Sequence, residues 1–181
     1  MIIGIDIDDV LNNLTESVLT VYRQDTGHQL FLNDIKEYNM TPFIKKEYQD
    51  TFFKYFGDKR VWDIIQPIYE GFDCIIDLWD KCYEIYFVTA THPLNLASKY
   101  EWLQKFIPFD PYRNLIVACD KSRIRLDILI DDCAEHFLPY HHGYLMRKPW
   151  NEGWEDMLKE QVRPVNDWFE IREYLQEGGL L

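Results

Sequence analysis

Short apolar runs alternate with longer amphipathic segments along the chain. The runs at 1–7, 83–88, 114–118, 126–130 and 144–146 are rich in β-branched and aromatic residues, which favours buried strands. Between several of them, apolar residues recur every three or four positions, as in a helix that buries one face. This order predicts an α/β fold in which helices pack on a parallel sheet.

Four segments have the periodicity of amphipathic helices. The first covers 14–23, and Gly27 provides a stop signal after it. The second covers 67–79 and opens on a proline, which is harmless in a first helical turn. The third covers 96–107, and the last begins after Asn166, which we expect to be its N-cap.

The region between the first strand and the second helix differs from the rest. It is rich in aromatic residues and irregular, with one short helix expected at 45–55. We therefore expect 14–64 to be a small helical cap inserted into a core domain made of 1–13 and 65–181.

Composition narrows the class of protein. The 181 residues are 47% apolar and 28% charged, as in a globular protein, with a net charge of −12. That charge, without a Lys/Arg stripe, argues against binding to a nucleic acid polymer. An acidic protein that binds phosphate needs a local cation, so the charge also hints at a divalent metal.

The sequence also indicates a compartment. No apolar run approaches the roughly 20 residues that span a bilayer, and no secretory signal is visible, so we expect no membrane association. The four cysteines include no CxxC pair, which favours a reduced cytoplasm. The sequence gives no indication of the oligomeric state.

Polar residues follow four of the predicted strands. The carboxyl ends of parallel strands meet at one edge of a sheet, where ligands bind, so these residues should converge there. They are Asp6, Asp8 and Asp9 after the first strand, Thr89 after the second, Lys121 after the third, and Asp131 and Asp132 after the fourth.

These residue types suit phosphoryl transfer. Crowded carboxylates repel one another, and Mg²⁺ relieves that repulsion because it prefers oxygen ligands. A carboxylate beside a metal-bound phosphate can attack phosphorus, which suits Asp6, and a second carboxyl two residues on can transfer protons, which suits Asp8. Thr89 and Lys121 can stabilise the charge on the transferred group.

The motifs resemble those of the haloacid dehalogenase (HAD) superfamily. GIDIDDVLNN is similar to its first motif, FVTA to its second, Lys121 to its third and LDILIDD to its fourth. The resemblance implies a HAD-like, Rossmann-like parallel sheet and an aspartyl-phosphate mechanism.

The same resemblance implies specific ligands. Magnesium would be held by the Asp6 side chain, the Asp8 backbone carbonyl and the Asp131-Asp132 pair, with the register favouring Asp132. Phosphate would be bound by residues around the second and third motifs, namely Thr89, Ala90 and Lys121.

A narrower resemblance is to the 5′-nucleotidase, or 5′(3′)-deoxyribonucleotidase, branch. It is carried by the spacing from Lys121 to the Asp131-Asp132 pair, by Pro67-Ile68, and by the segments KPWN and RPVNDW. It implies a (deoxy)nucleoside monophosphate as substrate. In the branch, glycine usually stands at the position of Asp9, and serine often at that of Ala90, so both departures bear on specificity.

Several alternatives remain open at this level. A HAD phosphatase for another phosphometabolite, such as a sugar phosphate, would share these motifs, and so would an inactive relative that only binds one. A response-regulator receiver has similar residues, but its lysine comes last, whereas Lys121 precedes Asp131. Each feature taken alone is common in turns and on solvated surfaces.

The aromatic residues of the 14–64 segment also have two interpretations. Phe52, Phe53, Tyr55 and Trp62 can stack on a nucleobase, or they can pack the segment against the rest of the protein. Packing is the commoner role for any one of them. His92, close to Thr89, is a further candidate for phosphate contact.

Overall fold

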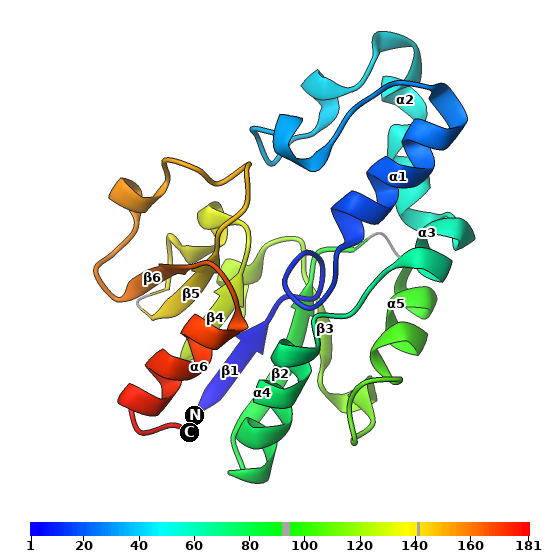
Figure 1. The fold of residues 1–181 in the computed structure, drawn as a ribbon. Coiled ribbons are helices and arrows are strands. Elements are labelled where there is room, and N and C mark those ends of the chain that lie inside the picture. Colours follow the sequence, from blue (N-terminus) through cyan, green and yellow to red (C-terminus); the bar gives the residue numbers. More distant parts are fainter. Residues whose placement is uncertain (92–94, 141) are drawn as a thin grey trace.

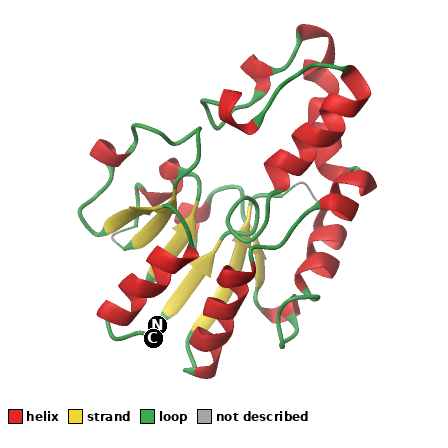
Figure 2. Ribbon diagram, in the orientation of Figure 1, coloured by secondary structure: helices red, strands yellow, loops and turns green. Residues whose placement is uncertain are grey.

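Six parallel strands form one sheet in the computed structural model, which describes residues 1–91, 95–140 and 142–181 (Figures 1 and 2). The spatial order is β3-β2-β1-β4-β5-β6. The strands are β1 (Ile2–Ile5), β2 (Glu84–Thr89), β3 (Leu115–Val117), β4 (Ile128–Asp131), β5 (Gly143–Met146) and β6 (Val162–Val165). The parallel sheet predicted from the apolar runs is therefore confirmed.

The first strand lies at the centre of this sheet. It pairs with β2 on one side and β4 on the other, with Ile5 opposite both Phe87 and Ile130. The ladder continues one residue further, since the Asp6 N–H donates to the Ile130 carbonyl at 2.9 Å. This register sets Asp6 beside Asp131, at the carboxyl edge where both strands end.

The two faces of the sheet are covered differently. Three helices, α4 (Tyr69–Asp80), α5 (Leu96–Leu103) and α6 (Trp168–Glu177), share one large hydrophobic cluster with Ile3 and Ile5. Side chains alternate along a strand, so the next positions belong to a second, smaller cluster on the opposite face. That cluster includes Phe137 from a short 3-10 turn, η8 (Ala134–Phe137).

The segment 14–64 lies beyond the carboxyl edge of the sheet (Figure 1). It contains α1 (Leu14–Thr26), α2 (Gln49–Phe52) and α3 (Lys59–Ile64), joined by short 3-10 turns. Helix α1 ends as predicted, because Gly27 takes the left-handed conformation, with φ 67°, that closes a helix. Tyr22 is fully buried there, in edge contact with the rings of Phe52 and Tyr55.

Two details of the predicted helices were wrong. The N-cap of α6 is Asp167, which accepts from the N–H groups of Phe169 at 2.9 Å and Glu170 at 3.0 Å, and Asn166 precedes it. The expected helix at 45–55 is broken into η3 (Lys46–Tyr48), the single turn α2 and η4 (Phe53–Gly57).

Strand β6 and helix α3 were not predicted. The strand is short and contains Pro164, which has no N–H for a ladder. It is tolerated because β6 is the last strand of the sheet and pairs on one side with β5.

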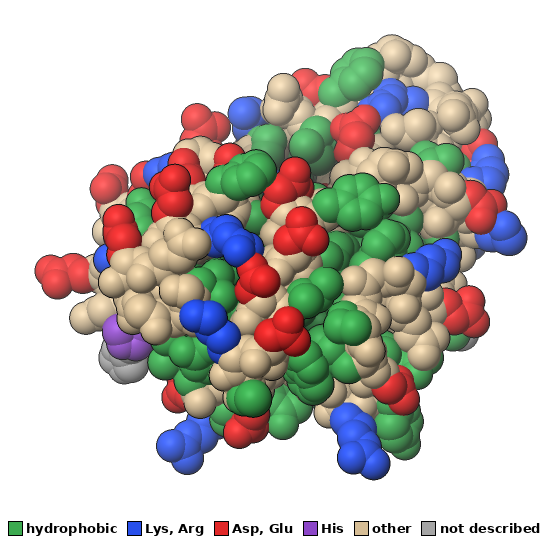
Figure 3. All heavy atoms as spheres, turned by 60° about the horizontal axis from the view of Figure 1, so that its bottom comes forward, with side chains coloured by type: hydrophobic (Ala, Val, Ile, Leu, Met, Phe, Trp, Pro, Cys, Tyr) green, Lys and Arg blue, Asp and Glu red, His purple; other side chains and the backbone are tan. Residues whose placement is uncertain are grey.

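The surface agrees with the charge pattern of the sequence. Figure 3 shows acidic and basic side chains interspersed on one face, with no continuous basic stripe there. In the part of the chain that the structure describes, no helix combines the length and apolar character needed to cross a membrane.

The last helix is tied to the loop after β1. The Trp168 indole N–H donates to the Val10 carbonyl at 2.8 Å, and the indole is 2% exposed. We expect Trp168→Phe to leave this carbonyl unpaired and to lower the free energy of unfolding by about 1–3 kcal/mol in urea denaturation. The exposed neighbour offers a control, and Phe169→Leu should stay within about 0.5 kcal/mol of wild type. Equal losses in the two variants would contradict the proposed tie.

Candidate active site

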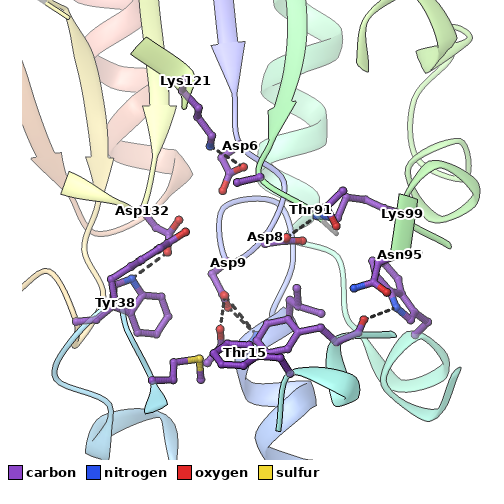
Figure 4. Close-up of a pocket in the computed structure, with 17 residues that line it drawn as sticks. Asp6, Asp8, Asp9, Thr15, Tyr38, Thr91, Asn95, Lys99, Lys121 and Asp132 are labelled. Atoms are coloured by element: carbon purple, nitrogen blue, oxygen red, sulfur yellow. Dashed lines mark hydrogen bonds and ion pairs between the residues drawn. The ribbon is translucent and has the colours of Figure 1, made fainter. Parts of the chain in front are cut away.

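A cavity of about 280 Å³ separates the carboxyl edge of the sheet from segment 14–64 (Figure 4). Both parts of the chain contribute to its wall. The sheet edge supplies Asp6, Asp8, Asp9, Ala90, Thr91, Asn95, Lys99, Lys121, Asp132 and Trp150, and segment 14–64 supplies Leu14, Thr15, Tyr38, Met40, Phe53, Phe56 and Trp62.

Lys121 joins two of the carboxylates. Its ammonium lies 2.8 Å from Asp6 Oδ1 and 2.6 Å from Asp131 Oδ2, and the lysine side chain is 1% exposed. Lys121 begins a short 3-10 turn, η7 (Lys121–Arg123), that follows β3. A buried ammonium is costly unless it is paired, so the two carboxylates and the lysine stabilise one another.

Asp131 is fully engaged by protein groups. Besides Lys121, its Oδ2 lies 2.9 Å from His136 Nδ1, and its Oδ1 accepts from the Cys133 N–H at 2.9 Å. Asp131 is 0% exposed and does not line the cavity. Its carboxylate therefore holds Lys121 in place from behind the cavity wall.

Asp132, in contrast, lines the cavity. One oxygen, Oδ2, accepts from the Trp150 indole N–H at 2.9 Å, and its backbone carbonyl accepts from the Asn151 side chain at 2.8 Å. Trp150 and Asn151 belong to the KPWN segment, so this loop orients Asp132. Asp6, Asp131 and Asp132 each offer an oxygen within 4.8 Å of the others, which is the spacing of a metal-binding group.

The pKa values of the three buried acids are shifted, those of Asp6 and Asp132 upward and that of Asp131 downward. Burial raises the pKa of Asp6 from 3.8 to about 6, since the attraction of Lys121 offsets it only in part. Burial and the charges of Asp131 and Asp6 hold the pKa of Asp132 well above its ordinary value. For Asp131, Lys121 and His136 outweigh burial and lower the pKa to about 2.

Asp8 forms an ion pair with a second buried lysine, Lys99. The Lys99 ammonium lies 2.5 Å from Asp8 Oδ2 and donates to the Thr89 hydroxyl at 2.7 Å. Lys99 comes from α5, and its side chain is 1% exposed. Figure 4 shows Asp8 and Lys99 meeting at the cavity wall.

Asp9 anchors the start of α1. Its carboxylate accepts from the Thr15 N–H at 3.1 Å and from the Thr15 hydroxyl at 2.5 Å. The backbone of Asp9 is left-handed, with φ 57°, a conformation that glycine adopts freely and aspartate tolerates. Asp9 therefore occupies a backbone position that would also suit glycine.

The sequence-predicted phosphate residues lie at different depths. Ala90 and Lys121 line the cavity, whereas Thr89 is 0% exposed and does not line it. Thr91, which was not predicted, lines the wall beside Ala90. His92 lies outside the described residues.

Sequence reasoning missed Lys99, although a signal was present. Lys99 falls three residues after Leu96 and four before Leu103, on the apolar stripe of the predicted helix. A lysine on that stripe points to a buried charge with a partner. Tyr38 and Asn95 come from irregular segments that carry no such signal.

Comparison with known proteins identifies the family. A family model described as "5′ nucleotidase, deoxy (pyrimidine), cytosolic type C protein" matches residues 1–176. The chain is 30% identical over 141 residues to a 5′(3′)-deoxyribonucleotidase of Clostridium acetobutylicum, covering 72% of each protein. It is 31% identical over 140 residues to one of Bacillus subtilis, covering 72% of this chain and 75% of that protein.

Solved structures agree in fold. A HAD family hydrolase from Deinococcus radiodurans, determined with bound phosphate and sodium, superposes with a TM-score of 0.68 at 12% identity, over 99% of this chain and 96% of that one. A putative β-phosphoglucomutase from Thermotoga maritima gives 0.63 at 12% identity, over 97% and 98%. The predicted HAD-like fold is thus confirmed. Because the family model spans nearly the whole chain, this protein belongs to the family described as 5′ nucleotidase, deoxy (pyrimidine), cytosolic type C, and it is a phosphatase with a HAD-like fold.

Proposed function

We propose that the protein is a magnesium-dependent phosphatase that hydrolyses deoxyribonucleoside monophosphates through a phosphorylated Asp6. One observation carries the proposal. A single cavity brings the buried Asp6–Lys121 pair and Asp132 together with aromatic side chains of segment 14–64.

The carboxylates suit a magnesium ion. Since both oxygens of Asp131 already have partners, we assign the ion to the side chains of Asp6 and Asp132 and the backbone carbonyl of Asp8. The raised pKa values of Asp6 and Asp132 mark carboxylates that a cation would relieve. When bound, Mg²⁺ supplies positive charge that neutralises the phosphate and favours nucleophilic attack.

The chemistry then divides between two aspartates. A carboxylate oxygen of Asp6 forms a bond to phosphorus while the ester bond to the leaving alcohol breaks, and Asp8 gives that alcohol its proton. In the second half, Asp8 takes a proton from water as the water oxygen bonds to phosphorus and Asp6 is released. Inorganic phosphate is the product.

The groups around Asp6 stabilise the transferred phosphoryl group. Lys121 lines the cavity and places an ammonium beside the nucleophile, where negative charge gathers in the transition state. Ala90 lines the wall at the end of β2, and we assign it a phosphate contact. Thr89 does not line the cavity, so we propose that it acts through Lys99.

The aromatic wall supports a nucleotide as substrate. Phe53 and Phe56 stack on each other with centroids 5.9 Å apart, and the Trp62 indole N–H donates to the Phe56 carbonyl at 3.0 Å. Flat apolar surfaces of this kind stack on nucleobases. The family description and the names of the relatives agree with this substrate class. We accordingly propose segment 14–64 as the cap of a core formed by 1–13 and 65–181.

A substrate panel tests this function. With Mg²⁺, we expect phosphate release from deoxyribonucleoside 5′- and 3′-monophosphates to exceed release from sugar phosphates. Asp6→Asn should abolish turnover and keep the fold, because the amide retains the shape but not the nucleophilic charge. Asp73→Asn makes the same change at an exposed position of α4 and should leave the rate unaltered. More than a few per cent of wild-type activity in Asp6→Asn would rule out the covalent mechanism.

Magnesium should stabilise the fold as well as support turnover. An ion that binds only the folded state adds about 2.7 kcal/mol at a hundredfold excess over Kd. For a chain of this length that corresponds to a rise in melting temperature of about 5 °C or more. Calcium should stabilise without supporting turnover, since its looser coordination misplaces the phosphate. If neither ion raises the melting temperature of metal-free protein, the assigned metal site is wrong.

The raised pKa of Asp6 predicts a pH dependence in EDTA. Its pKa, about 6, exceeds the unfolded value of 3.8, so the associated stability is complete below about pH 4 and is lost as the pH rises through about 6. Asn cannot ionise. We therefore expect the stability of Asp6→Asn relative to wild type, measured by urea denaturation, to increase between pH 4 and pH 7. For Asp73→Asn, the stability relative to wild type should not change with pH. If it does not change for Asp6→Asn either, the raised pKa of Asp6 is contradicted.

A further inference from the structure

The two buried lysines of the site serve different carboxylates. Lys121 contacts Asp6 and Asp131, while Lys99 contacts Asp8 and the Thr89 hydroxyl. Both lysine side chains are 1% exposed, although lysine rarely gives up its hydration. The proposed chemistry uses Lys121 directly, whereas Lys99 enters it so far only through its contact with Thr89.

The contact with Lys99 makes the two oxygens of Asp8 unequal. Oδ2 is held by the ammonium at 2.5 Å. Oδ1 is buried and has no hydrogen-bond partner among the residues that the structure describes. A buried carboxylate oxygen without a partner is uncommon in a folded protein and calls for an explanation. Asp8 lines the cavity, so a substrate or water bound there would supply the missing partner.

We propose that Lys99 is a positioning residue, which fixes Asp8 through Oδ2 so that Oδ1 is the atom that exchanges the proton. This inference rests on the proposed function of Asp8 as general acid and base. In the first half, the proton leaves Oδ1 for the ester oxygen as the bond from phosphorus to that oxygen breaks and the bond to Asp6 forms. In the second half, Oδ1 takes a proton from the attacking water, and Asp6 and phosphate are released.

Thr89 completes the arrangement. Its hydroxyl accepts from the same ammonium at 2.7 Å, and it is fixed at the end of β2, next to β1 in the sheet. Lys99 thereby ties the loop after β1 to the neighbouring strand and to α5. Because Lys99 is itself held by α5 and by Thr89, it keeps the Asp8 carboxylate in one orientation through both proton transfers, which is the requirement for a reacting group.

Lys99→Met tests the proposal, since methionine keeps much of the length and loses the charge. With a deoxyribonucleoside monophosphate and Mg²⁺, we expect kcat to fall about 10²-fold, the order of loss for a misplaced reacting group, with KM changed less than about threefold. Lys105→Met makes the same change at an exposed position just after α5 and should match wild type. An increase in KM with kcat unchanged would instead make Lys99 a phosphate ligand and overturn the positioning role.

A double variant separates positioning from an independent effect. If Lys99 acts through Asp8, Lys99→Met combined with Asp8→Asn should be as slow as Asp8→Asn alone, within about twofold. Multiplied losses would overturn the proposal. The double variant also removes the charges of both partners of this ion pair together, so it should fold even if Lys99→Met alone does not. Failure of the double variant to recover the fold lost in Lys99→Met would likewise count against the pairing.

The leaving group provides a readout that a purely structural defect would not move. Nitrophenolate leaves without a proton, so the first-turnover burst from p-nitrophenyl phosphate should keep its rate in Lys99→Met within about threefold. The first turnover of the nucleotide should slow about 10²-fold. Equal slowing of both would overturn the proposal. Wild-type rates in Asp8→Asn would show that the proposed function of Asp8 fails, whereas wild-type rates in Lys99→Met alone would refute only the role of Lys99.

Discussion

Three carboxylates, Asp6, Asp131 and Asp132, are buried within 4.8 Å of one another, and the surrounding structure is arranged around their mutual repulsion. The register of two central strands forces Asp6 and Asp131 together, and Lys121 is buried between them. The charges of Asp131 and Asp6 help to keep the pKa of Asp132 high. The folded chain therefore stores an unfavourable interaction at the edge of its sheet, which a cation can relieve.

This arrangement separates the tasks of the site. The carboxyl edge of the sheet supplies charge, held by short ion pairs and strand ends, while segment 14–64 supplies rings and apolar side chains. The aromatic part has its own packing around Tyr22, which contacts the rings of Phe52 and Tyr55.

Features that depend on local sequence were predicted correctly, whereas features that depend on the whole fold were missed. Strands β1 and β4 are short apolar runs with nearly all residues buried, and β2 is mostly apolar, so all three can be recognised from local sequence. Strand β6 was missed because Pro164 is acceptable only at a sheet edge, and the edge is a property of the whole fold. The N-cap of α6 was misplaced by one residue, since Asn166 and Asp167 are both good caps.

The site residues divide in the same way between those that topology predicts and those that depend on tertiary packing. The convergence of Asp6, Lys121 and Asp131 followed from strand ends, a rule that needs only topology. The pairing of Lys99 with Asp8 joins residues 91 positions apart and depends on how α5 lies against the sheet, which local pattern does not contain.

The central place of β1 has a consequence for the order in which the protein is made. Asp6 is synthesised before its partners, because its strand pairs on both sides with segments that follow much later, and the loop after it is held by Trp168. During synthesis the strand that carries Asp6 therefore stays unpaired until most of its partner segments have emerged. A nascent chain cannot assemble the carboxylate cluster before Asp132 is available, so the site appears late and all at once.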